Sequence, residues 1–470
     1  MGAAAPTLDV DSQRVPTPRS PPVVGVRVIA TTWSHRGIRC AERSPHDAAI
    51  GSVQSMRTGR IHYAWVVAAV TFLALLASAG FRSTVGLFIV PFEADFGWTR
   101  DQVSLAISIN LVCYGLMAPF SAAIVNRFGA RRMMMISLAV VAVGAGLTTT
   151  MTALWHLDVL WGVAIGSATG AISIPLSAIV ATRWFTRRRG LVTGLLAASF
   201  ATGNLIFLPL LAWITTEHGW RSAVWIVTIC AAAMIPLVAA LMRDHPSDIG
   251  VGPYGGEQVP SVPVPAGNPF RTPFVVLGRA VRVPDFWLLA GTFFICGWTT
   301  NGAVQTHFVP AAHDHGISEV SAAGVLAIIG IFDILGSTAS GWFTDRVDPR
   351  RLLFIYYSLR GVSLASLPLF FETGHAALIA FAVIYGLDWV ATVPPTVMLT
   401  NRAFGADAGV VFGWIFCSHM IGGAAAAWLA GYMRVVYDDY FIAFVGGGLL
   451  AVVAAFASLA IARGTRLSTT

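Results

Sequence analysis

The sequence predicts an all-α integral membrane protein with twelve transmembrane helices in two pseudo-symmetric halves of six. Three observations predict this class. Apolar residues make up 56% of the 470 residues and charged residues only 11%, with a mean hydropathy of +0.71, whereas soluble domains are about 25% charged. Long apolar stretches recur along the chain, and arginines gather in every second loop between them. A water-soluble fold is therefore excluded.

Each predicted helix is a run of about 20 mostly apolar residues, the length that crosses the hydrocarbon core of a bilayer. Turn-forming segments such as Phe96-Gly97-Trp98 separate neighbouring runs. The predicted spans are roughly 63–90, 102–125, 133–153, 158–182, 191–215, 221–242, 286–310, 320–343, 352–371, 375–399, 408–432 and 440–462.

The distribution of arginine predicts the orientation. The loops after the even-numbered spans carry fifteen arginines, and the loops after the odd-numbered spans carry three. Because positively charged loops stay on the cytoplasmic side, we expect the even-numbered loops and both termini in the cytoplasm. We expect a multi-pass protein of the inner (plasma) membrane.

Two longer segments lie outside the spans. The N-terminal one is polar and contains Pro and Arg, so we expect it to be disordered. Ordering on a partner is the alternative, and Met56 leaves a later translation start open. The predicted organisation is an extension at 1–60, a six-helix half at 61–243, a proline-rich cytoplasmic linker at 244–284, a second half at 285–463 and a tail at 464–470.

The composition also excludes several chemistries. All 30 basic residues are arginine, which excludes a lysine Schiff base and a nucleotide-binding GxxxxGK[ST] loop. The five cysteines are scattered without CxxC spacing. His313-Asp314-His315 is a weak metal motif that we interpret as a solvated loop. We expect no enzyme activity, no cofactor, no metal and no nucleic-acid partner, since basic loops account for the net charge of +7.

An internal repeat supports the division into two halves. The loop after span 2 and the loop after span 8 share a basic pattern, and Arg127 and Arg346 lie 219 residues apart. Such repeats suit alternating access around a site near the bilayer midplane. The polar residues of these two loops that we predict to act as a conformational latch are Asn126, Arg127, Arg131, Asp345, Arg346 and Arg350.

The repeated Gly-x-x-x-Asp-Arg-x-x-x-Arg-Arg pattern resembles the signature of the major facilitator superfamily. The second copy has Gly341, Asp345 and Arg346, while the first has Ala122 and Asn126 in place of the glycine and the acid. By this resemblance, the loops lock helices on the cytoplasmic side. Further motifs resemble the monocarboxylate-transporter-like (oxalate/formate-antiporter-like) branch, namely Phe96-Gly97-Trp98-Thr99-Arg100, Arg183-Trp184-Phe185, Thr300-Asn301-Gly302 and Gly386-Leu387-Asp388-Trp389.

Four charged residues lie deep inside predicted spans, where each costs about 2.5–3.5 kcal/mol on insertion scales and so points to function. They are Arg82, Asp333, Arg360 and Asp388. The resemblance implies a basic residue, usually Lys, at the place of Arg82. We predict that Arg82 binds an anion, since a guanidinium pairs with a carboxylate at two points. A structural arginine that pairs with Glu93 or Asp95 is the alternative.

The acids in the spans predict a proton site. Asp333 lacks the arginine that the resemblance implies four residues on, where Ser337 stands, and an unpaired carboxyl suits proton uptake. Asp388 is the second candidate. A helix–helix contact is the structural alternative for Asp333. For Asp388 the alternative is that it satisfies the backbone groups freed by Pro394-Pro395, which bend the helix. We expect Arg360 to be structural.

Neutral polar residues near the predicted anion site complete the set. Asn301 and Gln305 share a face of span 7, and Asn301 is the repeat mate of Arg82, so we expect both to orient the substrate. His307 and His419 are either proton relays or packing residues.

The sequence therefore predicts a secondary active transporter of a small organic anion. We expect a monocarboxylate, moved with a proton by alternating access. Two alternatives stay open: an exporter or antiporter of hydrophobic or dicarboxylic compounds on the same fold, and a solute sensor that moves nothing. The expected partners are the anion, the proton and the lipid bilayer.

Overall fold

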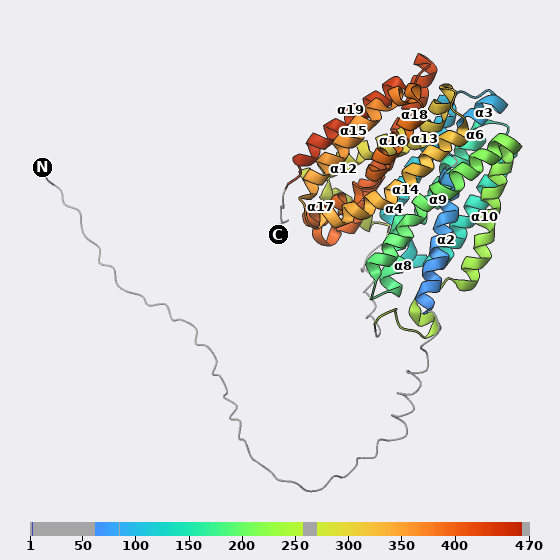
Figure 1. Ribbon diagram of the computed structural model, residues 1–470. Coiled ribbons are helices and arrows are strands. Elements are labelled where there is room, and N and C mark those ends of the chain that lie inside the picture. Colours follow the sequence, from blue (N-terminus) through green and yellow to red (C-terminus); the bar gives the residue numbers. More distant parts are fainter. Residues whose placement is uncertain (1, 3–61, 84, 257–269, 463–470) are drawn as a thin grey trace, which may run out of the picture. The chain divides into compact units, whose positions relative to one another are not determined.

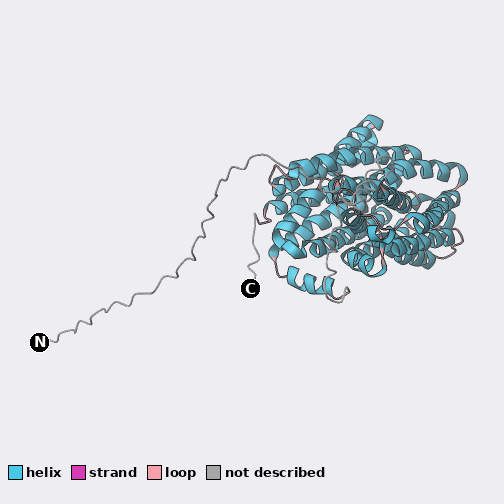
Figure 2. Ribbon diagram, turned by 90° about the horizontal axis from the view of Figure 1, so that it is seen from below, coloured by secondary structure: helices cyan, strands magenta, loops and turns pink. Residues whose placement is uncertain are grey.

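The computed structural model describes residues 2, 62–83, 85–256 and 270–462, and the regular elements among them are helices (Figures 1 and 2). An isolated bridge between Phe185 and Tyr254 is the one extended pairing in these ranges. The predicted all-α class is confirmed. Apart from Gly2, the predicted N-terminal extension lies outside the described residues, as does the predicted tail. The following concerns the second of the chain's two compact units, Ile61–Thr470.

The first half contains the six predicted spans in order. They are α2 (Tyr63–Ser83) with α3 (Ile89–Phe96), α4 (Arg100–Phe128), α5 (Ala130–Thr148), the series α6 (Leu154–Leu157), η1 (Asp158–Ile165), α7 (Gly166–Ala171) and α8 (Ile174–Trp184), then α9 (Arg189–His218) and α10 (Trp220–Leu241).

The second half repeats this order after a segment with two short helices, η2 (Pro246–Ile249) and α11 (Thr272–Ala280). Its spans are the series α12 (Pro284–Gly297), η3 (Trp298–Val304) and α13 (Gln305–Asp314), then α14 (Glu319–Thr344), α15 (Pro349–Thr373), α16 (His375–Asp388) with α17 (Val393–Phe404), α18 (Ala408–Tyr437), which η4 (Gly405–Asp407) precedes, and α19 (Phe441–Leu459).

By length and composition, eight helical stretches in the described residues are able to cross a membrane, or nine if α11 and the continuation Pro284–Asp314 count as one bent span. One of the eight, His375–Tyr437, contains two predicted spans, and Leu205–His218 is a shorter apolar helix within the fifth. Of the predicted spans, the fourth and the fifth are not among these stretches in the described residues, and the fourth is broken into short helices.

Local chemistry explains where several of these helices begin. Thr99 precedes α4, and its backbone N–H donates to the Gln102 side chain at 3.1 Å, one arm of a capping box. The Ser318 hydroxyl accepts the Ser321 N–H at the start of α14. Pro284 and Pro349 open α12 and α15, where a missing N–H costs nothing.

The fourth span of each half breaks at the same place in the repeat. In the first half α7 ends at Ala171 and α8 starts at Ile174 with a proline in its first turn. In the second half α16 ends at Asp388 and α17 starts at Val393, again with a proline in its first turn. A proline cannot donate to the preceding turn, so the helix is interrupted.

The two halves meet along paired helices, with α4 against α18 and α9 against α14 (Figure 1). Glycines permit this close approach. A Cβ at Gly86, in the loop between α2 and α3, would lie 2.5 Å from the Thr306 carbonyl oxygen in α13. A Cβ at Gly413 in α18 would lie 2.9 Å from the Cα of Pro119 in α4. The groups near the middle of this interface are candidates for a transport site.

Candidate substrate and proton sites

Arg82 lies in the last turn of α2, at the boundary between the halves. Its Nη2 donates to Oδ1 of Asn301 in η3 at 3.3 Å, and its guanidinium carbon lies 4.1 Å from the centroid of the Tyr114 ring in α4. Its Nη1 is buried and has no hydrogen-bond partner among the described residues. Arg82 is half-buried and thus offers a buried donor without a partner in the described residues, on a group that stays charged.

The acids that we considered as partners of Arg82 are engaged elsewhere. Glu93 accepts from Arg100 Nε at 3.0 Å. Asp95 accepts from the Trp220 indole and from Arg221, both at 2.8 Å, and these two hydrogen bonds lower the pKa of Asp95. Within the described residues, no carboxylate lies within ion-pair distance of Arg82.

Asn301 is held in place by His419 of α18. The ring Nδ1 of His419 lies 3.1 Å from the Phe293 carbonyl oxygen, and its Nε2 lies 2.9 Å from Nδ2 of Asn301. A carbonyl only accepts, so Nδ1 carries the proton and Nε2 accepts from the amide. This arrangement directs the amide oxygen of Asn301 toward Arg82.

The other predicted substrate residue is not joined to this chain. Gln305 begins α13 and is half-buried, and in the described part of the protein no hydrogen bond links it to Arg82 or Asn301. Its backbone oxygen faces Gly86, at 2.7 Å from the place of an added Cβ.

Asp388 is ion-paired with Arg360 in the interior of the second half. Arg360 Nε lies 2.6 Å from Asp388 Oδ2, and the two side chains are 0% and 3% exposed. The guanidinium also donates to Cys296 Sγ and to the carbonyls of Asp388 and Trp389, which the break after α16 leaves free. Arg360 therefore supplies hydrogen-bond donors to the carbonyls at the break. Oδ1 of Asp388 is buried without a hydrogen-bond partner in the described residues.

Asp333 approaches the same break from α14 but has a different environment. Its Oδ1 accepts the Val390 N–H at 3.0 Å, and the residue is 8% exposed. No arginine lies within ion-pair distance of Asp333 in the described ranges. The break between α16 and α17 thus gathers two buried acids, one paired with a cation and one held by a backbone amide.

Two predicted latch residues occupy equivalent places in the repeat. Arg131, at the start of α5, donates to the Ala239 carbonyl near the end of α10, and its backbone N–H donates to Asp244 at 2.9 Å. Arg350, at the start of α15, donates to the Leu459 and Ile461 carbonyls at the end of α19 and pairs with Asp348 at 2.7 Å. Each arginine ties the third span of its half to the sixth.

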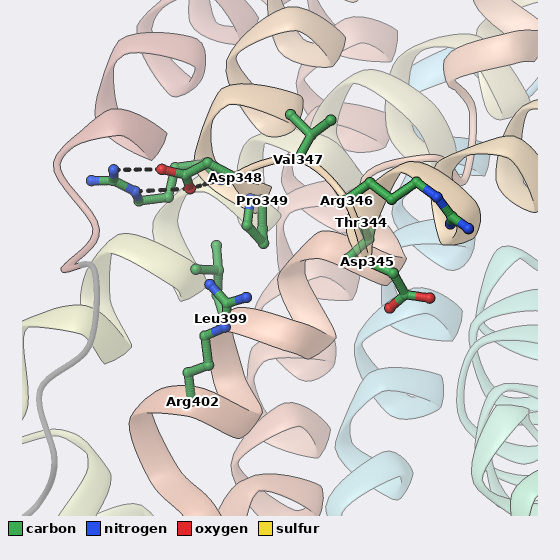
Figure 3. A pocket seen from close by; sticks show the side chains of 9 residues that line it. Thr344, Asp345, Arg346, Val347, Asp348, Pro349, Leu399 and Arg402 are labelled. Carbon is green, nitrogen blue, oxygen red and sulfur yellow. Dashed lines mark hydrogen bonds and ion pairs between the residues drawn. The ribbon is translucent and has the colours of Figure 1, made fainter.

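The remaining predicted latch residues make local contacts. Asn126 accepts from Arg183, the Arg127 guanidinium lies over Phe128, and the Arg346 guanidinium lies 4.0 Å from the Trp342 ring centroid. Asp345 and Arg346 line a pocket of about 340 Å³ with seven other residues, and the two side chains point away from the Asp348–Arg350 pair (Figure 3). In the described part of the chain, these hydrogen bonds, ion pairs and ring contacts of the six predicted latch residues join groups of the same half.

Comparison with known proteins assigns the family. The model of the Major Facilitator Superfamily matches residues 71–427. This chain belongs to the Major Facilitator Superfamily. The predicted resemblance is confirmed, and so is the fold. The protein is a multi-pass membrane protein of a transporter family.

The relatives of this superfamily member lie in the predicted branch. It is 29% identical over 396 residues to monocarboxylate transporter 13 of Bos taurus, covering 82% of this chain and 86% of that protein. It is 26% identical over 392 residues to monocarboxylate transporter 11 of Mus musculus, covering 82% and 84%. It is 25% identical over 339 residues to the oxalate:formate antiporter of Oxalobacter formigenes, covering 71% and 75%.

The odd-numbered loops lie at one end of the helices, here called the odd-loop end. An ion-pair network at this end was not predicted from the sequence. Arg100 at the start of α4 binds Asp314 at the end of α13 through both guanidinium Nη atoms, each at 2.7 Å. Arg434 of α18 pairs with Asp314 at 2.8 Å, and the Tyr440 hydroxyl accepts from Arg100 at 3.2 Å. These four residues are the odd-loop network.

The segment His313-Asp314-His315 is exposed, as predicted, but the ion pairs of Asp314 were not expected from the sequence. The side chain of Asp314 is 18% exposed and paired with two arginines. The available signal was charge: two of the three arginines in the odd-numbered loops are Arg100 and Arg434, and Asp314 follows the first span of the second half.

Proposed function

We propose that the protein is a secondary active transporter that carries a small organic anion, in the class of monocarboxylates, across the membrane with a proton. The unused buried Nη1 of Arg82, at the boundary between the halves, carries this proposal. A carboxylate that accepts from Nη1 and Nη2 would replace the weak 3.3 Å bond to Asn301 with charge-assisted bonds. The names of the relatives support the same substrate class.

The rest of the substrate site follows from the neighbours of Arg82. The face of the Tyr114 ring fixes the guanidinium plane by a cation–π contact. Asn301, held by His419, orients the substrate with its amide, and Gln305 lies one turn further along the same span. These groups come from both halves, so substrate binding responds to their relative movement, as alternating access requires.

For the proton we propose the acids at the break in span 10. Asp333 is the better candidate of the two, because it has no cation at ion-pair distance in the described residues and a backbone amide holds it. Asp388 shares this break, and its Oδ1 is buried without a hydrogen-bond partner in the described residues. Proton binding at Asp333 would therefore affect the backbone at Val390, whereas Arg360 binds the carbonyls of the two residues before Val390.

We infer that both termini lie in the cytoplasm of a cell whose plasma membrane holds the protein, because the arginine-rich loops are the even-numbered ones. The predicted latch residues then lie at the cytoplasmic end. A tag at the C-terminus should be cleaved by added protease in inverted membrane vesicles and protected in right-side-out vesicles. The reverse pattern would overturn the orientation.

The test of function is uptake of labelled small monocarboxylates into proteoliposomes under an inward proton gradient. We expect Arg82→Ala to abolish uptake while the purified protein keeps its yield and its elution volume. Arg221→Ala is the matched control, because Arg221 is exposed and pairs with Asp95 of its own half. Uptake that survives Arg82→Ala contradicts the proposal, and a variant that fails to fold makes Arg82 structural.

Exchange is the second candidate mode, since one relative is named an oxalate:formate antiporter. Counterflow distinguishes the modes without any proton gradient. Labelled anion that enters only against unlabelled anion inside indicates obligatory exchange. Binding without any flux would instead identify a sensor.

A further inference from the structure

The odd-loop network joins the two halves by an ion pair of unusually complete geometry. The guanidinium of Arg100 belongs to the first half, and the carboxylate of Asp314 belongs to the second. Their side chains are only 7% and 18% exposed. A bidentate, partly desolvated pair is stronger than a surface ion pair. The odd-loop end is therefore held closed in this structure.

A hydrogen-bond chain leads from this ion pair to a buried histidine. The Tyr440 oxygen accepts from Arg100 and lies 3.3 Å from Nδ1 of His307 in α13. On its other side, His307 Nε2 lies 2.7 Å from the Ala427 carbonyl oxygen of α18, and the residue is 0% exposed. Because a carbonyl only accepts, Nε2 carries the proton. Nδ1 then accepts from the Tyr440 hydroxyl, and each group in the chain has one consistent role.

We propose that His307 is a proton-binding site whose occupancy releases the Arg100–Asp314 ion pair and opens the odd-loop end. A proton on Nδ1 turns this atom from an acceptor into a donor, so the Tyr440 hydroxyl loses the acceptor for its own hydrogen. It also places a second positive charge one tyrosine away from Arg100. The closed arrangement therefore binds this proton less tightly than an open one in which water surrounds the imidazole, so protonation favours opening.

The charged groups around His307 agree with this direction. Arg100 and Arg434 are cations, and Asp314 is shared between them. Glu93 lies beyond Arg100 and is partly exposed. On α14, which packs against α13, Glu319 interacts with His313. Tyr440 is the titratable group in hydrogen-bond contact with His307, so no carboxylate in the described residues binds the new charge directly.

This inference rests on the proposed transport function and adds a role for the proton in it. If the odd-loop end faces outward, acid outside the cell opens the transporter toward the proton-rich side. Asp333 lies elsewhere, at the break in span 10, so loading of a proton and release of the odd-loop end are separate events.

Spin-label distances across the odd-loop end test the proposal. Labels replace Glu217, at the exposed end of α9, and Glu372, at the exposed end of α15, in a protein with serine at its cysteine positions. We expect the label distance to shift to longer values as the pH falls from about 7.5 to about 4.5, a range that extends below the ordinary histidine range because a buried imidazole binds its proton less tightly than a solvated one. His307→Gln should abolish this shift, and Asp314→Asn should give the long distance at both pH values.

Three variants make the result decisive. His218→Gln is the matched control, an exposed histidine at the end of α9 that should leave the shift intact. Tyr440→Phe removes the connecting hydroxyl and should reduce the shift. This variant takes the place of His307→Gln if His307→Gln fails to fold. Arg82→Ala should keep the shift although anion uptake is lost. Failure of the His307 proposal can therefore be distinguished from failure of the proposed transport function. A shift that persists in His307→Gln, or no shift in the parent, overturns the proposal.

Discussion

Two arginines inside the spans have opposite environments. Arg360 donates to a carboxylate, a thiol and two carbonyls, and it is fully buried in one half. Arg82 has one weak hydrogen bond, one aromatic face and an unused donor at the boundary between the halves. A permanently charged group with satisfied donors stabilises structure, whereas one with a free donor has capacity for a ligand.

Removal of the carboxylate from the Arg360–Asp388 pair should destabilise the protein. Asp388→Leu leaves a fully buried cation without its counter-ion, which costs about 3–5 kcal/mol. We expect the double variant Arg360→Met/Asp388→Leu to regain most of this loss, because an apolar pair of similar volume needs no solvation. Thermal unfolding in detergent measures the stability of both variants. Equal melting temperatures for the parent and Asp388→Leu would contradict the role of the pair.

Neutralisation of Asp333 should separate anion movement from proton movement. In Asp333→Asn the amide oxygen can still accept the Val390 N–H, so the fold is kept. We expect exchange of labelled anion to continue while uptake driven by a proton gradient is lost. Ser337→Ala, which removes a hydroxyl bonded only to its own helix in the described residues, is the control. Gradient-driven uptake that survives in Asp333→Asn would exclude Asp333 as the proton site.

At the scale of elements, the broken helices of spans 4 and 10 and the close contact of spans 1 and 7 shape the interior. The α16–α17 break exposes the carbonyls and amides that Arg360 and Asp333 bind. Gly86 brings the loop between α2 and α3 against the backbone of α13, close to Arg82 and Asn301. The close contact depends on Gly86, because a Cβ at this position would meet backbone atoms that must shift.

A side chain at Gly86 should prevent spans 1 and 7 from closing. In Gly86→Val the new Cβ meets the Thr306 and Gln305 carbonyl oxygens at 2.5 and 2.7 Å, and neither backbone atom can rotate away. We expect loss of anion uptake with a lower melting temperature. Gly194→Val in α9 is the matched control, since a Cβ there meets no atom within 4 Å. Normal uptake by Gly86→Val would mean that this contact is dispensable.

The elements were largely predictable, and the contacts between them were not. Apolar length predicts the spans and Pro394-Pro395 predict a bend in span 10, because these depend on local chemistry and on the bilayer. The partners of Asp388 and Asp314 depend on which helices pack together. Arg360 is 28 residues from Asp388 and Arg100 is 214 from Asp314, so no local pattern joins them.

At the scale of the whole molecule, the halves are tied together at the odd-loop end, while the predicted latch residues at the other end bind within their own halves. Arg131 and Arg350 make each half rigid, since they join its third span to its sixth. Two rigid halves that a breakable ion pair joins at the odd-loop end are able to rock against each other, which is the movement that alternating access needs.

A covalent bridge across the odd-loop end should arrest the cycle. In a cysteine-free protein, Arg100→Cys/Asp314→Cys joined by a short bifunctional reagent should lose uptake, and a cleavable reagent should restore it on reduction. Tyr63→Cys/Leu241→Cys is the control, because its bridge joins two spans of one half. If the bridge between the halves leaves uptake unchanged, the odd-loop end does not open during transport.

The low exposure of the Arg100–Asp314 pair also determines how the protein responds to dissolved salt. Mobile ions screen charges that they can approach, and this pair is 7% and 18% exposed, whereas the Arg221–Asp95 pair is 49% and 42% exposed. Raising ionic strength weakens the second pair much more than the first. We therefore expect the Arg100–Asp314 pair to keep most of its strength from dilute to saline media, and the proposed opening by protons to depend little on ionic strength.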